Sequence, residues 1–145
     1  MSEFAIGAAC RVDVPSYSRK IAEIEVGLDP EGVAVDVARR RAYVACSRSD
    51  WVTVVDLEEH QALGRVRVGK EPIDLVFDAP TDRIFTADAH ADSVSVVDAE
   101  TLRLTATIPV GAYPSGLAYD RDARRLYCGN CRRTARLLGG SRGRS

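Results

Sequence analysis

The side chains best suited to chemistry lie between Asp88 and Asp92, where two carboxylates and the imidazole of His90 alternate with alanines. In an extended segment all three would share one face, and carboxylate and imidazole groups can hold a divalent metal. The segment falls in a predicted loop, however, and the corresponding loop one repeat earlier keeps only Asp50. We therefore favour a polar surface loop and keep Asp88, His90 and Asp92 as metal-ligand candidates.

One C-x-x-C pair, Cys128 and Cys131, occurs among the four cysteines. A zinc site needs two further ligands, usually a second C-x-x-C or a histidine pair, and the sequence offers neither. A redox pair places its first thiol at a helix N-terminus, whereas Cys128 falls in a strand pattern. We interpret the spacing as coincidental and predict no cofactor.

Recognisable catalytic motifs are absent. The sequence contains no G-x-S-x-G, HExxH, P-loop or GxGxxG. We therefore nominate no catalytic residue and lean towards a protein that is not an enzyme.

The composition is ordinary for a globular domain, with 145 residues, 46% hydrophobic and 28% charged, and a net charge of −1. This balance disfavours nucleic acid as a partner, and no apolar run approaches the ~18 residues of a membrane helix. The last fourteen residues hold five arginines and no acid, which predicts a solvated, disordered tail. The first residues do not resemble a signal peptide, so a cytoplasmic protein is expected.

An ungapped repeat of 42 residues organises the chain. The segment VGLDPEGVAVD, which starts at Val26, returns as VGKEPIDLVFD at Val68 and as VGAYPSGLAYD at Val110. RAYVAC from Arg41 likewise matches RIFTAD and RLYCGN in the later copies. Five columns are identical in all three copies: Val26/Val68/Val110, Gly27/Gly69/Gly111, Pro30/Pro72/Pro114, Asp36/Asp78/Asp120 and Arg41/Arg83/Arg125.

Each copy contains four short β-rich runs separated by turn residues. In the first copy they are residues 32–36, 41–46, 51–56 and about 62–68. A four-stranded antiparallel meander cannot bury both faces of its sheet alone, so the copies must stack. Four strands in about 40–45 residues are typical of propeller blades. We predict an all-β protein of β-propeller blades that forms an incomplete or open propeller arc in a single chain.

These repeats resemble the YVTN-repeat family of β-propellers, which is WD-repeat-like in architecture. The family pattern reads Y-V-T/A-N, then V-S-V-I-D, then an outer strand ending I-P-V-G, then P-x-G-V-A. It is matched here, over about residues 10–130, by Tyr43-Val44-Ala45, Val94-Ser95-Val96-Val97-Asp98, Ile108-Pro109-Val110-Gly111 and Pro114-Ser115-Gly116-Leu117-Ala118. The Asn column departs from the pattern, because Cys46 and Asp88 stand there and only Asn130 fits.

We expect structural roles for the repeated residues, because every blade needs the same turns whereas chemistry needs asymmetry. The prolines belong in the linker before the first strand, and the glycines permit positive φ between blades. The aspartates accept N–H groups of the turn where the first strand ends. The arginines are expected to pair with the aspartates of their own blade.

By analogy with the family, residues 32–36, 74–78 and 116–120 form the innermost strands. Asp74 is their one non-repeated charge, since Gly32 and Gly116 occupy its column. It is the candidate for a ligand in the channel, although a solvated aspartate at a loop edge is the simpler interpretation. Trp51 and Tyr113 could make exposed aromatic contacts, and packing between blades is the simpler role for Trp51.

The register divides the chain into five parts. They are residues 1–26, the last two strands of a partial blade; 27–68 and 69–110, two blade repeats; 111–131, the first half of a blade; and 132–145, the basic tail. Three blades do not close a ring, because propellers have about 4–8. Either two chains complete a ring as a homodimer, or the chain is a fragment or truncated form of a longer propeller.

The expected function is a non-enzymatic scaffold that binds a protein or a small ligand. The alternative implied by propeller families is part of a lactonase or sugar-lactone hydrolase, whose metal ligands would come from several blades. A truncated product without function is the third hypothesis. The resemblance also allows export, since family members can be exported.

Overall fold

The computed structural model describes residues 7–12, 20–130 and 135–138, which contain thirteen β-strands. In chain order they are β1 (Gly7–Val12), β2 (Lys20–Gly27), β3 (Pro30–Asp36), β4 (Arg41–Cys46), β5 (Trp51–Asp56), β6 (Gln61–Arg67), β7 (Pro72–Asp78), β8 (Arg83–Asp88), β9 (Ser93–Asp98), β10 (Arg103–Pro109), β11 (Pro114–Asp120), β12 (Arg125–Asn130) and β13 (Ala135–Leu138). The strands predicted for the first copy agree with β3 to β6 within two residues. The described residues include no helix that could cross a membrane.

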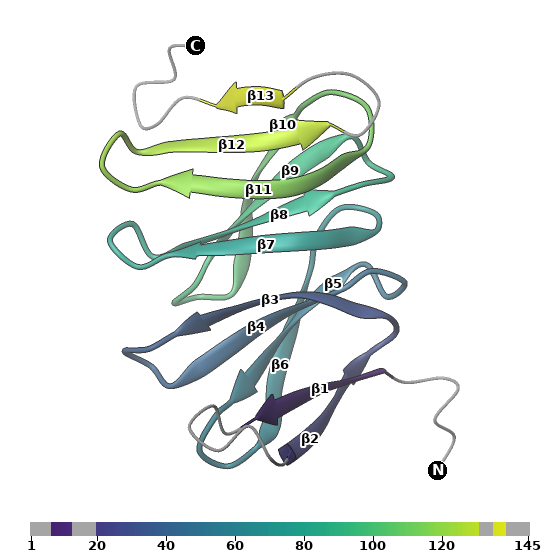
Figure 1. The fold of residues 1–145 in the computed structure, drawn as a ribbon, viewed down its shortest axis with the longest axis vertical. Coiled ribbons are helices and arrows are strands. Elements are labelled where there is room, and N and C mark those ends of the chain that lie inside the picture. The colour runs from purple at the N-terminus through teal and green to yellow at the C-terminus, as the bar shows by residue number, and fades with distance from the viewer. Residues whose placement is uncertain (1–6, 13–19, 131–134, 139–145) are drawn as a thin grey trace.

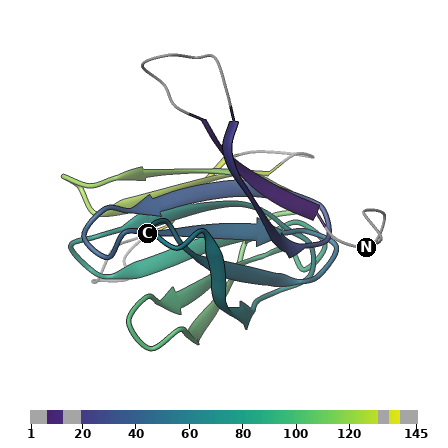
Figure 2. The ribbon, with the colours of Figure 1, turned by 90° about the horizontal axis from the view of Figure 1, so that it is seen from below.

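Four antiparallel sheets stack in chain order along the long axis of the molecule (Figure 1). Two are four-stranded meanders, β3–β6 and β7–β10, flanked by the hairpin β1–β2 and the three-stranded sheet β11–β13. The hairpin runs steeply across the direction of the other strands (Figure 2). The first strands β3, β7 and β11 lie next to one another along the stack. The prediction of an all-β protein with propeller blades in an open arc is confirmed.

The stacking explains why the middle strands of the two whole blades are largely buried. A neighbouring sheet covers each face of β4, β5, β8 and β9, and most of their side chains are buried. The outer strands β6 and β10 are mostly exposed. Three apolar clusters fill the junctions. The cluster between the whole blades contains Tyr43, Val54 and Ile84. The cluster beside β2 contains Ile24, Val26 and Val44, and the cluster beside β12 contains Val94, Leu126 and Cys128.

The C-terminal segment differs from the predicted disordered tail, because Ala135–Leu138 forms β13 and pairs with β12. The ungapped repeat failed to show this strand because its register is shifted. Ala42 pairs with Val55 in the first blade, whereas the equivalent Leu126 pairs with Leu138, one residue earlier than the period requires. The prediction of only two strands after residue 110 is therefore wrong. Residues 131–134 and 139–145 of the predicted tail lie outside the described residues.

The repeated aspartates cap the turn after the first strand of each blade, as predicted. Oδ atoms accept backbone N–H groups in all three copies: Arg39 to Asp36 at 3.1 Å, Thr81 to Asp78 at 3.2 Å and Ala123 to Asp120 at 3.1 Å. The prolines begin the first strands instead of preceding them, a position where a missing N–H is tolerated.

The predicted pairing of repeated arginines with these aspartates is wrong. Arg83 Nη1 lies 3.4 Å from Asp98 Oδ2, on the third strand of its blade. Backbone N–H groups of Thr101 and Glu100 and then the charge of Arg83 lower the pKa of Asp98. Arg41 and Asp56 pair in the same register in the first blade.

The repeated glycines are required for close packing and not, at Gly69 and Gly111, for positive φ. A Cβ at Gly69 would lie 2.5 Å from Asp88 Oδ2, and one at Gly111 would lie 2.7 Å from Asn130 Nδ2. The positive φ angles fall two residues later in each linker, at Asp29, Glu71 and Tyr113, with φ of 50°, 59° and 54°. Among the glycines that the structure describes, only Gly27 combines a positive φ, of 154°, with a close contact, to Trp51 Nε1.

Candidate functional site

Asp74 lies among the first strands of three successive sheets. Its Oδ2 accepts the backbone N–H of Leu117 on β11 at 2.9 Å, and its Oδ1 accepts the N–H of Leu75 at 2.9 Å. On the other side, a Cβ at Gly32 of β3 would lie 2.9 Å from the Cα of Asp74. The half-buried carboxylate thus joins neighbouring blades, and its role as a channel ligand stays a prediction.

The three metal-ligand candidates are directed to separate partners. β8 ends at Asp88 and a turn follows, so the segment is not extended. His90 Nδ1 lies 2.9 Å from Glu71 Oε2, and Asp92 Oδ1 accepts the N–H of Tyr113 at 3.0 Å. No group of three or more His, Cys, Asp or Glu side chains is arranged for a metal within the described part of the chain.

Asp88 is fully buried in the Asn column of the second blade. Its carboxylate accepts hydrogen bonds from the hydroxyls of Thr86 at 2.7 Å, Ser95 at 2.5 Å and Ser93 at 3.3 Å. Burial raises the pKa of Asp88, and these hydroxyls oppose the shift only in part. The carboxylate therefore packs against Gly69 as a structural group, in the position that Asn130 holds in the third copy.

Cys128, the described member of the C-x-x-C pair, is buried in β12 as a free thiol. Burial raises its pKa, which works against the thiolate that redox chemistry requires. Cys131 lies outside the described residues.

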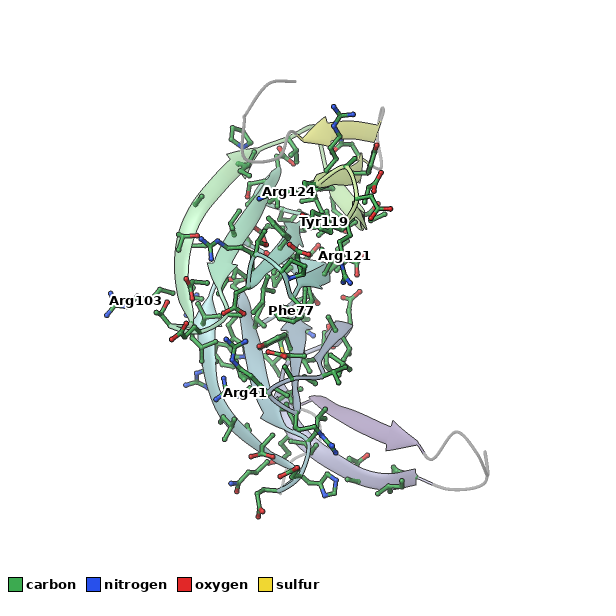
Figure 3. The ribbon with its side chains drawn as sticks, turned by 90° about the vertical axis from the view of Figure 1, so that its left-hand side faces the viewer. Arg41, Phe77, Arg103, Tyr119, Arg121 and Arg124 are labelled. Atoms are coloured by element: carbon green, nitrogen blue, oxygen red, sulfur yellow. The ribbon has the colours of Figure 1, made fainter. Side chains whose placement is uncertain are left out.

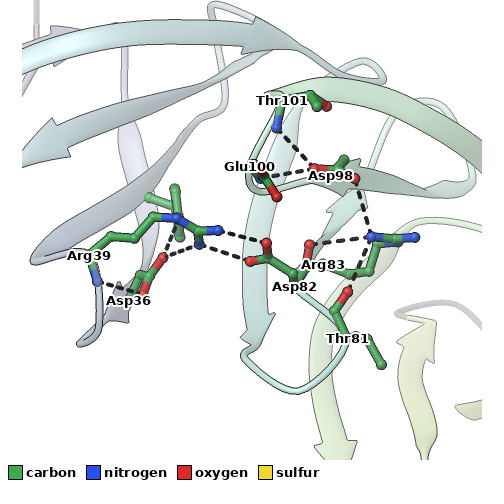
Figure 4. A network of polar contacts seen from close by, with 9 residues as sticks. Asp36, Arg39, Thr81, Asp82, Arg83, Asp98, Glu100 and Thr101 are labelled. Carbon is green, nitrogen blue, oxygen red and sulfur yellow. Dashed lines mark hydrogen bonds and ion pairs between the residues drawn. The ribbon is translucent and has the colours of Figure 1, made fainter.

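A salt-bridged clamp closes the junction between the two whole blades (Figure 4). Arg39, in the turn after β3, donates to Asp36 Oδ2 at 2.8 Å and to both carboxylate oxygens of Asp82 at 2.8 and 2.7 Å. Tyr43 donates its hydroxyl to Asp36 at 2.8 Å. Burial would raise the pKa of Asp36, but the hydrogen bonds from Arg39 and Tyr43 hold it below its usual range.

The next junction, between β7 and β11, holds a pocket where the clamp would be. The columns of Arg39, Tyr43 and Asp82 carry Thr81, Phe85 and Arg124 in the second and third copies. The resulting cavity of about 200 Å³ is lined by Asp78, Pro80, Thr81, Tyr119, Arg121 and Arg124. Figure 3 shows the side chains of Tyr119, Arg121 and Arg124 gathered at one place, with Arg103 projecting from the other side of the molecule.

A larger cleft of about 450 Å³ lies between β2 and the first whole blade. Its wall is formed by Val26, Leu28 and Trp51, with Glu25, Ser49 and Arg65 around it. Trp51 packs against the apolar cluster beside β2, as expected, and donates its indole N–H to the carbonyl of Val26 at 3.2 Å. The guanidinium of Arg65 lies 4.0 Å above the indole ring, which is a cation–π contact.

Trp51 and Asp74 were predicted from the sequence, whereas Arg65, Arg121 and Arg124 were not. All three arginines interrupt the repeat, since their columns carry Thr107, Ala79 and Asp82 in the second copy. Positions that depart from the repeat therefore indicated the cavity-lining residues, whereas the identical columns did not.

Solved structures with a similar fold include hydrazine synthase from Kuenenia stuttgartiensis, with a TM-score of 0.86 and 19% identity over 94% of this chain and 41% of that chain. A functionally unknown protein from Desulfotomaculum acetoxidans DSM 771 gives 0.80 and 14% identity, with coverage of 94% and 46%. Apo AztD from Citrobacter koseri gives 0.62 and 21% identity, with coverage of 77% and 31%.

The chain spans less than half the length of each of these structures. No protein-family model matches it, and no curated protein matches it. At these identities the likeness establishes the fold alone, and that fold is the β-propeller.

Proposed function

We propose that this chain is part of a YVTN-type β-propeller that acts as a non-enzymatic binding scaffold, with the cleft beside Trp51 as its ligand site. The observation that supports this function is the cleft itself. Its volume of about 450 Å³ falls in the range of small-molecule sites, and an apolar wall with few polar groups is typical of them.

The lining of the cleft selects the chemistry of the ligand. The indole N–H of Trp51 is already donated to Val26, so the apolar ring is what the residue offers to a ligand. Arg65 adds a positive charge directly above that ring. A small molecule that combines a planar apolar part with an acidic group would pack on the indole and pair with the guanidinium.

The carboxylates that a hydrolase would use are already hydrogen-bonded within the fold. This favours a binding role over catalysis. Asp74 accepts two backbone N–H groups, Asp88 accepts three hydroxyls and Asp92 accepts one backbone N–H. Each is therefore engaged in holding a blade or a linker. Lactone hydrolysis stays the alternative, and a chelator-sensitive turnover of gluconolactone by the purified chain would favour it over the scaffold.

Trp51 is the single tryptophan of the chain, so its fluorescence reports directly on the cleft. We expect benzoate to change this fluorescence in a saturable way and benzylamine to do so at least tenfold more weakly, because only benzoate can pair with Arg65. Arg65→Ala should abolish the benzoate response, whereas Arg103→Ala, an exposed arginine on β10, should leave it unchanged. A response that is absent, or that Arg65→Ala leaves intact, would rule out this cleft as the site.

A further inference from the structure

The pocket between β7 and β11 contains a buried acceptor without a donor among the described residues. Asp78 is 1% exposed, and none of these residues donates a hydrogen bond to its Oδ1. The other oxygen, Oδ2, accepts both the backbone N–H and the hydroxyl of Thr81. Arg121 forms a long ion pair with this oxygen, with Nε 3.7 Å from Oδ1, but its side chain is 64% exposed and donates no hydrogen bond to it. A buried carboxylate oxygen left in this state is costly.

The first junction shows which group fits such an acceptor. There the equivalent Asp36 is also 1% exposed, but it receives the guanidinium of Arg39 and the hydroxyl of Tyr43. At the second junction both donors are missing, because Thr81 and Phe85 occupy their columns. The hydroxyl of Tyr119 also approaches Asp78: burial raises its pKa most, and the charge of Asp78 and side-chain hydrogen bonding to it raise it further. The place of the guanidinium itself is taken by the pocket.

The rim of the pocket carries positive charge at the position where the first junction carries the negative charge of Asp82. Asp82, which receives the far side of the Arg39 guanidinium, is replaced by Arg124, and Arg121 stands beside it. A ligand that offers only a cation would meet two arginines. A ligand with an acidic group at its other end would pair with them.

We propose that this pocket binds a small guanidino acid or amino acid. The cationic end donates to Asp78 Oδ1 in the position that Arg39 occupies at the first junction, and the carboxylate lies between Arg121 and Arg124. The cavity of about 200 Å³ is roughly the share of six or seven water molecules, at about 30 Å³ each. Guanidinoacetate is a molecule of this size and charge pattern. The site is separate from the Trp51 cleft and does not depend on it.

The test is titration calorimetry of the full chain with guanidinoacetate, methylguanidinium and acetate, supported by amide NMR shifts at Thr81, Arg121 and Arg124. Guanidinoacetate should bind at least tenfold more tightly than either half-molecule. Asp78→Asn should weaken its binding at least tenfold, because the charged acceptor is lost. Arg103→Ala, a surface change on the other side of the molecule, should have no effect.

Two substitutions in the turns test the same proposal by giving the second junction a charge or a side chain that the first junction has. Arg124→Asp restores the charge of Asp82 and should reverse the preference, so that methylguanidinium binds more tightly than guanidinoacetate. Thr81→Arg supplies the missing guanidinium from the chain itself and should abolish binding. Both positions lie outside the buried core, so these variants remain informative if Asp78→Asn fails to fold.

Two results would overturn the proposal. Equal binding of acetate and guanidinoacetate, unaffected by Asp78→Asn, would mean that the arginines form a simple anion site. Absence of binding by all three probes to the folded chain would mean that Arg121 turns inward and satisfies Asp78 itself. The benzoate response of Trp51 checks the other site independently, so the failure of one does not imply the failure of the other.

Discussion

The two junctions between successive first strands, β3 to β7 and β7 to β11, share one backbone plan but differ at the three positions that form the clamp. Each has a buried aspartate that caps the turn after the first strand. At the first junction Arg39, Tyr43 and Asp82 complete a clamp. At the second, the equivalent positions leave a pocket and a carboxylate oxygen to which no described residue donates.

This difference shows how a repeat protein can keep its packing in every blade while changing the shape of one junction. The period fixes the strands, the capping aspartates and the close glycine contacts, which every blade needs. Where the period is lost at two turn positions and one strand position, a cavity replaces the closed contact. The repeat therefore serves as an internal control, because each substitution at one junction has a counterpart at the other.

The largest effect is expected from breaking the clamp. Arg39→Ala leaves the buried Asp36 and its neighbour Asp82 without their cation, which should lower the free energy of unfolding by about 3 kcal/mol. Thr81→Ala, the same column at the second junction, should cost about 1 kcal/mol, since only a neutral donor is lost. Urea unfolding followed by circular dichroism measures both.

The clamp also predicts a pH dependence of its own. The pKa of Asp36 is lowered in the folded state, so its contribution is present above the unfolded value of 3.8 and is lost as the pH falls through the lower native pKa. Acid unfolding of Arg39→Ala should lack this component. Equal stability of Arg39→Ala and Thr81→Ala at pH 7 would contradict the difference between the junctions.

A methyl group added at the linker glycines should have the next largest effect, at about 2 kcal/mol. Gly69→Ala drives Cβ into the carboxylate of Asp88, and Gly111→Ala drives it into the amide of Asn130. Gly116→Ala on β11 is the matched control, because no atom of the described residues lies within 4 Å of the place its methyl group would take. Thermal unfolding midpoints should fall for the first two variants only, and a similar fall for Gly116→Ala would remove the packing explanation.

Exchanging the residues of the Asn column between the second and third copies should shift stability by about 1 kcal/mol in opposite directions. Asp88→Asn removes a buried charge and should stabilise the protein at neutral pH, whereas Asn130→Asp introduces one and should destabilise it. Because burial raises the native pKa of Asp88 above its unfolded value, the wild-type protein gains stability as the pH falls through that native pKa and loses it as the pH rises.

The measurement for this pair is the free energy of unfolding between pH 4 and pH 8. Asp88→Asn should flatten the profile, and Asn130→Asp should steepen it. A wild-type profile that Asp88→Asn leaves unchanged would show that the hydroxyls of Thr86, Ser93 and Ser95 keep the carboxylate ionised without cost.

The smallest effect is expected at the turn position where the backbone is left-handed. Arg40 is exposed with a φ of 54°, a conformation that costs an L-residue more than glycine. Arg40→Gly should therefore raise stability by about 0.5 kcal/mol, after the entropic cost of glycine is included. Arg103→Gly, on a strand with ordinary φ, should lower it by a similar amount in the same urea titration.

Most of the fold could be predicted because the 42-residue repeat determines where the strands of each blade lie. An ungapped repeat of 42 residues with four β-rich runs determines the blades, and the predicted strands of the first blade lie within two residues of β3 to β6. β13 escaped prediction because a one-residue shift removes it from the ungapped register. A pattern that depends on strict spacing cannot show a strand that has moved.

The roles of individual side chains were harder to predict, because sequence separation does not determine which groups meet. Arg83 and Asp78 are direct partners in the ladder, yet the guanidinium lies beside Asp98 on the other neighbouring strand. The linker glycines suggested positive φ, yet their neighbours two residues later adopt it. The pocket at Asp78 could have been found by comparing Arg39 with Thr81 and Tyr43 with Phe85, since those columns break the period.

Asp74 distinguishes the second copy from the other two. A chain with repeated blades can misassemble by stacking one copy in the place of another, and homologous contacts alone do not prevent it. The second copy, however, carries a carboxylate where the first and third have glycine. This carboxylate accepts the amide of Leu117 on one side, and the backbone of Asp74 packs closely against Gly32 on the other. At the end of the stack this carboxylate would lose the amide of the blade that follows it, so Asp74 favours a place for its copy between two others.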